Sequence, residues 1–86
     1  MVNDKYMKLY EYLKSIPEAQ IRAELTIEEI EKILGEALPV SAHRYPTWWT
    51  NNENHMQAKA WLRAGWTVKE INLLEKRVTL TRRGQT

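Results

Sequence analysis

Apolar residues recur with two different spacings in the first part of the chain. Tyr6, Tyr10 and Leu13 follow one another at intervals of four and three residues, which predicts a helix over residues 4–16. Residues 20–25 then alternate between polar and apolar positions, with a period of two. This spacing is typical of an extended segment, because successive side chains of a strand point to opposite faces.

The second predicted helix has the clearest boundaries in the chain. Thr26 is a good N-cap residue, and Glu29, three positions later, completes a capping box. Gly35 provides the end, because glycine adopts the left-handed conformation of a helix C-terminus at little cost. The core-facing stripe of this helix consists of Ile27, Ile30, Ile33 and Leu34.

Residues 36–52 contain two prolines and show neither helical nor strand periodicity, which predicts a long ordered loop. A connection of this length inside a small domain is usually functional, and adjacent tryptophans argue against disorder. A third helix is expected to follow, capped by Asn52 or Asn54 and running to about residue 64, before Gly65.

The C-terminal part predicts a β-hairpin. Its strands are expected at residues 66–73 and 78–82, joined by a turn at residues 74–77. In the first strand the apolar residues change from even to odd positions between Val68 and Ile71, which indicates a β-bulge near Lys69 and Glu70.

These elements predict an α+β fold in a single domain of residues 1–86. Three helices followed by a C-terminal hairpin give the element order of a winged helix-turn-helix domain, with a long ordered loop before the third helix. In that arrangement the helix over residues 54–64 would enter the major groove of DNA. The hairpin tip at residues 75–77 would lie along the backbone of the nucleic acid.

The composition of the chain bears on where in the cell the protein is expected. The chain of 86 residues has no cysteine, which excludes disulfides and thiolate zinc sites. It has no apolar run near the roughly 20 residues that a membrane span needs, and its N-terminus is too polar for a secretion signal. We therefore expect a cytoplasmic protein without a membrane partner and without a cofactor.

The charge is distributed unevenly along the chain. Residues 1–36 contain five Lys or Arg against eight Asp or Glu, whereas residues 37–86 contain eight against three. The second part therefore carries a net charge of +5 within a total of +2. A basic part of this kind indicates an anionic partner, and it favours nucleic acid.

All four tryptophans lie between residues 48 and 66. Trp61 and Trp66 flank a helix end and are expected to be core residues. Trp48 and Trp49 are adjacent in irregular chain, so one is expected to enter the core while the other faces a ligand. An exposed indole would stack on an unpaired base.

The same stretch resembles a small uncharacterised prokaryotic domain family, whose members share the pattern S-A-x-[KR]-x-x-x-W-W-x-N followed by Q-x-x-A-W-x-x-A-G-W. Ser41, Arg44 and the Trp48-Trp49 pair fit the first part of the pattern, and Gln57 opens the second. His43 stands where members of the family often have arginine. The resemblance extends over nearly the whole chain and implies that these residues form one unit, with no activity attached to it.

We therefore predict a nucleic-acid-binding module, with duplex DNA favoured over RNA. Arginine and lysine suit phosphates and guanine edges, while the amides of asparagine and glutamine suit adenine edges. The predicted contact residues are Ser41, His43, Arg44, Trp48, Trp49, Asn51, Asn52, His55, Gln57, Lys59, Arg63, Lys76 and Arg77.

The alternative is a protein-interaction module, an inhibitor or adaptor in a phage-host or defence setting, anchored by the tryptophan loop. Catalysis is not expected. His43 and His55 match no spacing of metal ligands, and the chain has neither a phosphate-binding glycine loop nor a nucleophile motif.

Overall fold

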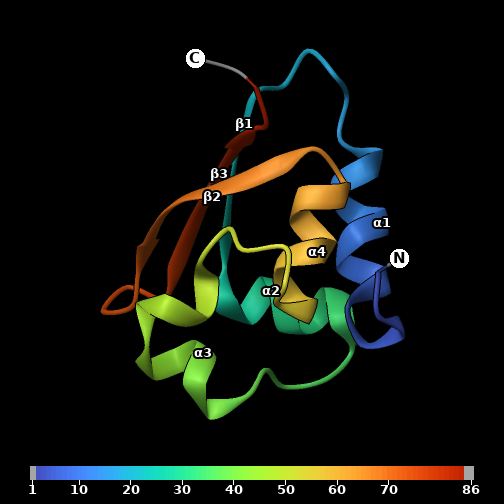
Figure 1. Ribbon diagram of the computed structural model, residues 1–86. Coiled ribbons are helices and arrows are strands. Elements are labelled where there is room, and N and C mark those ends of the chain that lie inside the picture. The colour runs from blue at the N-terminus through green and yellow to red at the C-terminus, as the bar shows by residue number, and fades with distance from the viewer. Residues whose placement is uncertain (1, 85–86) are drawn as a thin grey trace.

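The computed structural model describes residues 2–84, which form helices and a β-sheet (Figure 1). None of the helices in this range has the length and apolar character that crossing a bilayer requires. In chain order the elements are η1 (Asp4–Tyr6), α1 (Met7–Ser15), β1 (Arg22–Thr26), α2 (Ile27–Leu34), α3 (Val40–Arg44), η2 (Pro46–Trp49), α4 (Met56–Arg63), β2 (Trp66–Asn72) and β3 (Arg77–Arg82), where η marks a 3-10 helix.

The three strands form one antiparallel sheet in the order β1-β3-β2. The predicted hairpin is confirmed as β2 and β3, and the extended segment predicted at residues 20–25 is confirmed as β1. β1 pairs with β3 along its whole length, so the hairpin is part of a three-stranded sheet and does not stand alone. The fold class is α+β, as predicted.

The predicted bulge in β2 is also present. The register with β3 shifts between Val68 and Glu70, so Lys69 has no partner on β3. The extra residue lets Val68 and Ile71, three positions apart, both contribute to the core. The same face of the sheet is therefore apolar on both sides of the irregularity.

Helices α1, α2 and α4 cover one side of the sheet, with α1 packed against both of the others (Figure 1). The interface between the helices and the sheet contains a single cluster of buried apolar side chains. The largest fully buried residues in it are Leu13, Ile27, Ile30, Trp61, Trp66 and Val78. Trp61 and Trp66 are thus core residues, as expected.

The boundaries of α2 agree with the prediction. The Thr26 hydroxyl accepts a hydrogen bond from the backbone N–H of Glu29, and the Glu29 carboxylate accepts one from the N–H of Thr26. Gly35 ends the helix with a φ of 79°, in the left-handed region. Both signals are local in sequence, which is why they could be read without the structure.

The predicted loop at residues 36–52 is wrong, because this segment contains α3 and η2. α3 spans five residues and buries only Ala42, and so short a helix shows no periodicity. The predicted cap of the following helix is also wrong. α4 begins after His55, which forms no capping bond, while the side chain of Asn52 accepts the backbone N–H of Asn54 in a turn ahead of it.

Candidate binding cleft

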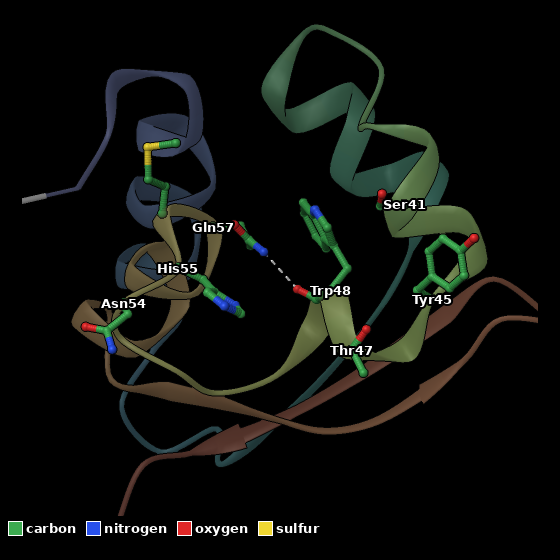
Figure 2. Close-up of a pocket in the computed structure, with 8 residues that line it drawn as sticks. Ser41, Tyr45, Thr47, Trp48, Asn54, His55 and Gln57 are labelled. Atoms are coloured by element: carbon green, nitrogen blue, oxygen red, sulfur yellow. Dashed lines mark hydrogen bonds between the residues drawn. The ribbon is translucent and has the colours of Figure 1, made fainter.

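A cleft of about 510 Å³ opens between the α3–η2 segment and the start of α4 (Figure 2). Trp48 projects from η2 into the space between these two walls. The residues that line it are Ser41, Tyr45, Thr47, Trp48, Asn54, His55, Met56 and Gln57. Both walls come from the segment in which the sequence concentrates its tryptophans and amides.

The wall that α3 forms is held in place by Glu31 of α2. One oxygen of its carboxylate accepts the backbone N–H of Leu38 at 2.7 Å and lies 3.1 Å from Nε2 of His43. The hydrogen bond from Leu38, followed by the interaction with His43, lowers the pKa of Glu31 against the opposing effect of desolvation. His43 was predicted as a contact residue, but its ring faces Glu31 and joins α3 to α2.

Asn51 fixes the chain between the two walls. Its side-chain oxygen accepts the indole N–H of Trp61 and the backbone N–H of Val68, both at 2.9 Å. Its side-chain nitrogen donates to the carbonyl oxygen of Val68. Asn51 therefore satisfies a backbone position on the outer edge of β2, so its side-chain amide has a structural role.

Trp48 and Trp49 lie on opposite sides of η2, as expected for adjacent residues. Trp49 is only 3% exposed, stacks on Trp61 and donates its indole N–H to the carbonyl oxygen of Ala42. Its predicted contact with a ligand is therefore wrong. Trp48 is partly exposed, and its ring stands at 70° to that of Trp49.

Trp48 is held in position by contacts with Tyr6 and Gln57. Tyr6 of η1 contacts its ring edge-on, and the side-chain amide of Gln57 donates to its backbone carbonyl oxygen at 3.0 Å (Figure 2). Burial, followed by the charge of Glu36, raises the pKa of Tyr6, so the phenol beneath the indole stays neutral at physiological pH. Contacts within the fold therefore position Trp48 in the cleft without a ligand.

Several basic residues of the second half contact partners within the described chain. Arg82 stacks on Trp66 and donates to three carbonyl oxygens of the connection between α1 and β1. Arg63 and Arg83 both lie close to the carboxylate of Glu53, at 4.0 and 3.4 Å. Arg77 lies 3.7 Å from the carboxylate of Glu75.

The predicted contact residues thus fall into separate groups. Ser41, Trp48, His55 and Gln57 line the cleft, while His43, Trp49, Asn51 and Asn52 stabilise the segment around it. Arg44 ends α3, Lys59 and Arg63 belong to α4, and Lys76 and Arg77 lie at the hairpin turn. The prediction lacked four lining residues, Tyr45, Thr47, Asn54 and Met56.

The exposure of Tyr45 and Met56, 55% and 56%, is a property of the folded segment that no local pattern indicates. The only advance signal for these two residues was their position in the stretch of the chain that also holds Trp48, Trp49 and the amides. Among the described residues, no group of three or more His, Cys, Asp or Glu is arranged to hold a metal ion.

The fold and the cleft define a small α+β domain with a polar and aromatic recess beside its fourth helix. The chain belongs to the family described as "Domain of unknown function (DUF7662)", whose model matches residues 6–84. The match includes every residue that lines the cleft. No curated protein matches the chain. No solved structure matches it either.

Proposed function

We propose that the domain is a nucleic-acid-binding module of the winged helix-turn-helix type, which contacts duplex DNA through the start of α4 and through the β2–β3 hairpin. The observation that carries the proposal is the topology. α4 directly precedes a hairpin whose second strand, β3, pairs with the strand between α1 and α2. A recognition helix followed by a β wing has this order, and α3 with η2 would be an insertion ahead of the recognition helix.

The side chains of α4 support the same proposal. Ala58, Ala60, Trp61 and Leu62 of the helix are buried, while Met56 and Arg63 are exposed and Lys59 is partly exposed. Gln57 in the first turn, together with Asn54 and His55 just ahead of the helix, carries the polar groups of the cleft wall. Amides and imidazoles at the start of a recognition helix are suited to base edges, while flanking cations are suited to phosphates.

A salt series with a labelled duplex tests the proposal. The affinity should fall steeply from low to physiological ionic strength, because phosphate contacts release counterions. Arg44→Ala and Lys59→Ala should each reduce the slope of log affinity against log salt by about 1. Lys14→Ala, on the exposed side of α1, is the matched control and should leave the slope unchanged. Absence of binding at low salt would refute the proposal.

A protein-interaction module is the second candidate, because three exposed apolar residues lie at or beside the cleft. Val40 is 67% exposed, and Tyr45 and Met56 are each more than half exposed. No lysine, arginine, aspartate or glutamate of the described chain lines the cleft. Depletion of charge together with aromatic residues and methionine is typical of the centre of protein interfaces.

A further inference from the structure

The indole N–H of Trp48 differs from those of the other three tryptophans. Trp49, Trp61 and Trp66 donate theirs to Ala42 O, Asn51 Oδ1 and Leu13 O, at 2.9, 2.9 and 3.2 Å. The indole of Trp48 has no hydrogen-bond acceptor among residues 2–84, and it stands in the cleft (Figure 2). A donor fixed in an accessible recess is available to a ligand.

The walls around Trp48 offer further polar groups. The side chains of Ser41, Asn54 and His55 form no hydrogen bond with any other described residue, although each lines the cleft. Gln57 uses its amide nitrogen on the backbone of Trp48, which leaves its carbonyl oxygen as an acceptor. Figure 2 shows Ser41, His55 and Gln57 on the sides that face the partly exposed ring of Trp48, whereas the side chain of Asn54 points away from it.

These groups fit a nucleobase better than a phosphate. A phosphate or a carboxylate calls for cationic partners, and none of the described residues lining the cleft is a lysine or an arginine. A volume of about 510 Å³ lies within the range of small-molecule sites. Arg44 directly precedes Tyr45 of the cleft wall in the chain and is exposed, so an accessible cation is available next to this wall in sequence.

We propose that the cleft between η2 and α4 binds one unpaired nucleobase, held against Trp48 and hydrogen-bonded by its indole N–H and the side chains of His55 and Gln57. This inference rests on the proposed function and specifies its ligand. A base inside a duplex is stacked and paired, so it reaches such a recess only from single-stranded nucleic acid or after leaving the helix. The domain would then prefer strands with an unpaired base over fully paired duplex.

The test follows the four indole N–H signals in nitrogen-edited NMR spectra, assigned by single Trp→Phe variants. The probes are a deoxythymidine hexamer, a fully paired duplex and the same duplex with one unpaired adenine. We expect the hexamer and the bulged duplex to move the Trp48 signal, while the other three signals stay almost unchanged. The bulged duplex should bind at least about fivefold more tightly than the paired one, which corresponds to one base–aromatic stack.

Variants separate the cleft from the rest of the surface. Trp48→Phe retains a ring but removes the indole N–H, and Asn54→Ala with His55→Ala alters the opposite wall. Each should reduce the preference for the bulged duplex severalfold and leave the binding of paired duplex unchanged. Tyr12→Ala is the control, because Tyr12 is an exposed aromatic residue of α1 that does not line the cleft. Unchanged thermal melting of the cleft variants confirms that they are folded.

The possible failures are distinguishable. Equal binding of bulged and paired duplex, with a stationary Trp48 signal, would overturn the base site and leave nucleic-acid binding intact. Absence of binding to all three probes at low salt would overturn the proposed function, and with it the proposed nucleobase site. A Trp48 signal that responds to the blocked peptide Gly-Tyr-Gly but to no oligonucleotide would assign the cleft to a protein partner and overturn the base proposal.

Discussion

Trp48 and Trp49 are adjacent in sequence, yet the two sides of η2 on which they lie have opposite properties. On the inner side, Trp49 is buried and donates its indole N–H to a neighbour within the fold, and Asn51, which follows η2, likewise uses its polar groups within the fold. On the outer side, Trp48 and the polar residues opposite it leave donors and acceptors unused within the described chain. The comparison teaches that residue type alone does not mark a binding site. The hydrogen bonds that a side chain already makes within the fold decide which of its polar groups remain available to a ligand.

The largest expected difference between the two sides concerns stability. Trp49→Ala should lower the free energy of unfolding by about 3–5 kcal/mol, because it removes a buried ring and leaves the carbonyl of Ala42 without its donor. Trp48→Ala should cost only about 1–2 kcal/mol, because that ring is partly exposed. Urea unfolding of both variants measures the difference. Equal losses would abolish the distinction between an inner and an outer side.

Two neighbouring asparagines provide a second comparison. Asn51→Ala removes three hydrogen bonds, to Trp61 and to both backbone groups of Val68, and should cost about 2–4 kcal/mol. Asn52→Ala removes one exposed bond to the N–H of Asn54 and should cost less than about 1 kcal/mol. Chemical denaturation checks both values. If Asn51→Ala were as mild as its neighbour, residue 51 would be available for a ligand after all.

How much of this the sequence revealed depends on the range of each interaction. The capping box of α2 and the bulge of β2 depend on residues close in sequence, and both were predicted. The role of Asn51 depends on Val68, seventeen positions away, and the position of α3 depends on a carboxylate of α2. Such contacts exist only after the chain has folded. The sequence therefore indicated the segment that forms the cleft, but not which of its side chains are used within the fold and which line the cleft.

The attachment of α3 to α2 predicts a smaller, pH-dependent effect. The hydrogen bond from Leu38 lowers the pKa of Glu31, so its carboxylate stabilises the fold above the unfolded-state pKa. That contribution disappears as the pH falls through the lowered pKa, in the range below about 4.5. Glu31→Gln should lose about 1 kcal/mol at neutral pH and show a flatter decline in acid.

Urea unfolding at neutral and acidic pH measures that difference. Glu28→Gln is a suitable control, since Glu28 is an exposed residue of the same helix. Parallel pH profiles of wild type and Glu31→Gln would show that the wall of the cleft is not anchored by this carboxylate.

The smallest expected effect on stability concerns Glu53, which lies between the cleft and the C-terminal end of α4. Its carboxylate is near the guanidinium groups of both Arg63 and Arg83, and all three side chains are about half exposed. Exposed ion pairs contribute little, so Glu53→Gln should change the free energy of unfolding by less than about 1 kcal/mol.

The same variant extends the comparison to the charged surface beside the cleft. If this surface contacts phosphates, freeing the two guanidinium groups should raise the affinity for duplex about threefold at low salt and steepen its salt dependence. Anisotropy titrations of Glu53→Gln and wild type measure both quantities, and Glu75→Gln gives the matched release of Arg77 at the hairpin turn. A gain from Glu75→Gln alone would mean that the hairpin approaches the nucleic acid and the end of α4 does not. A gain from neither would confine recognition to the neutral cleft, where affinity would depend on the base and only weakly on salt.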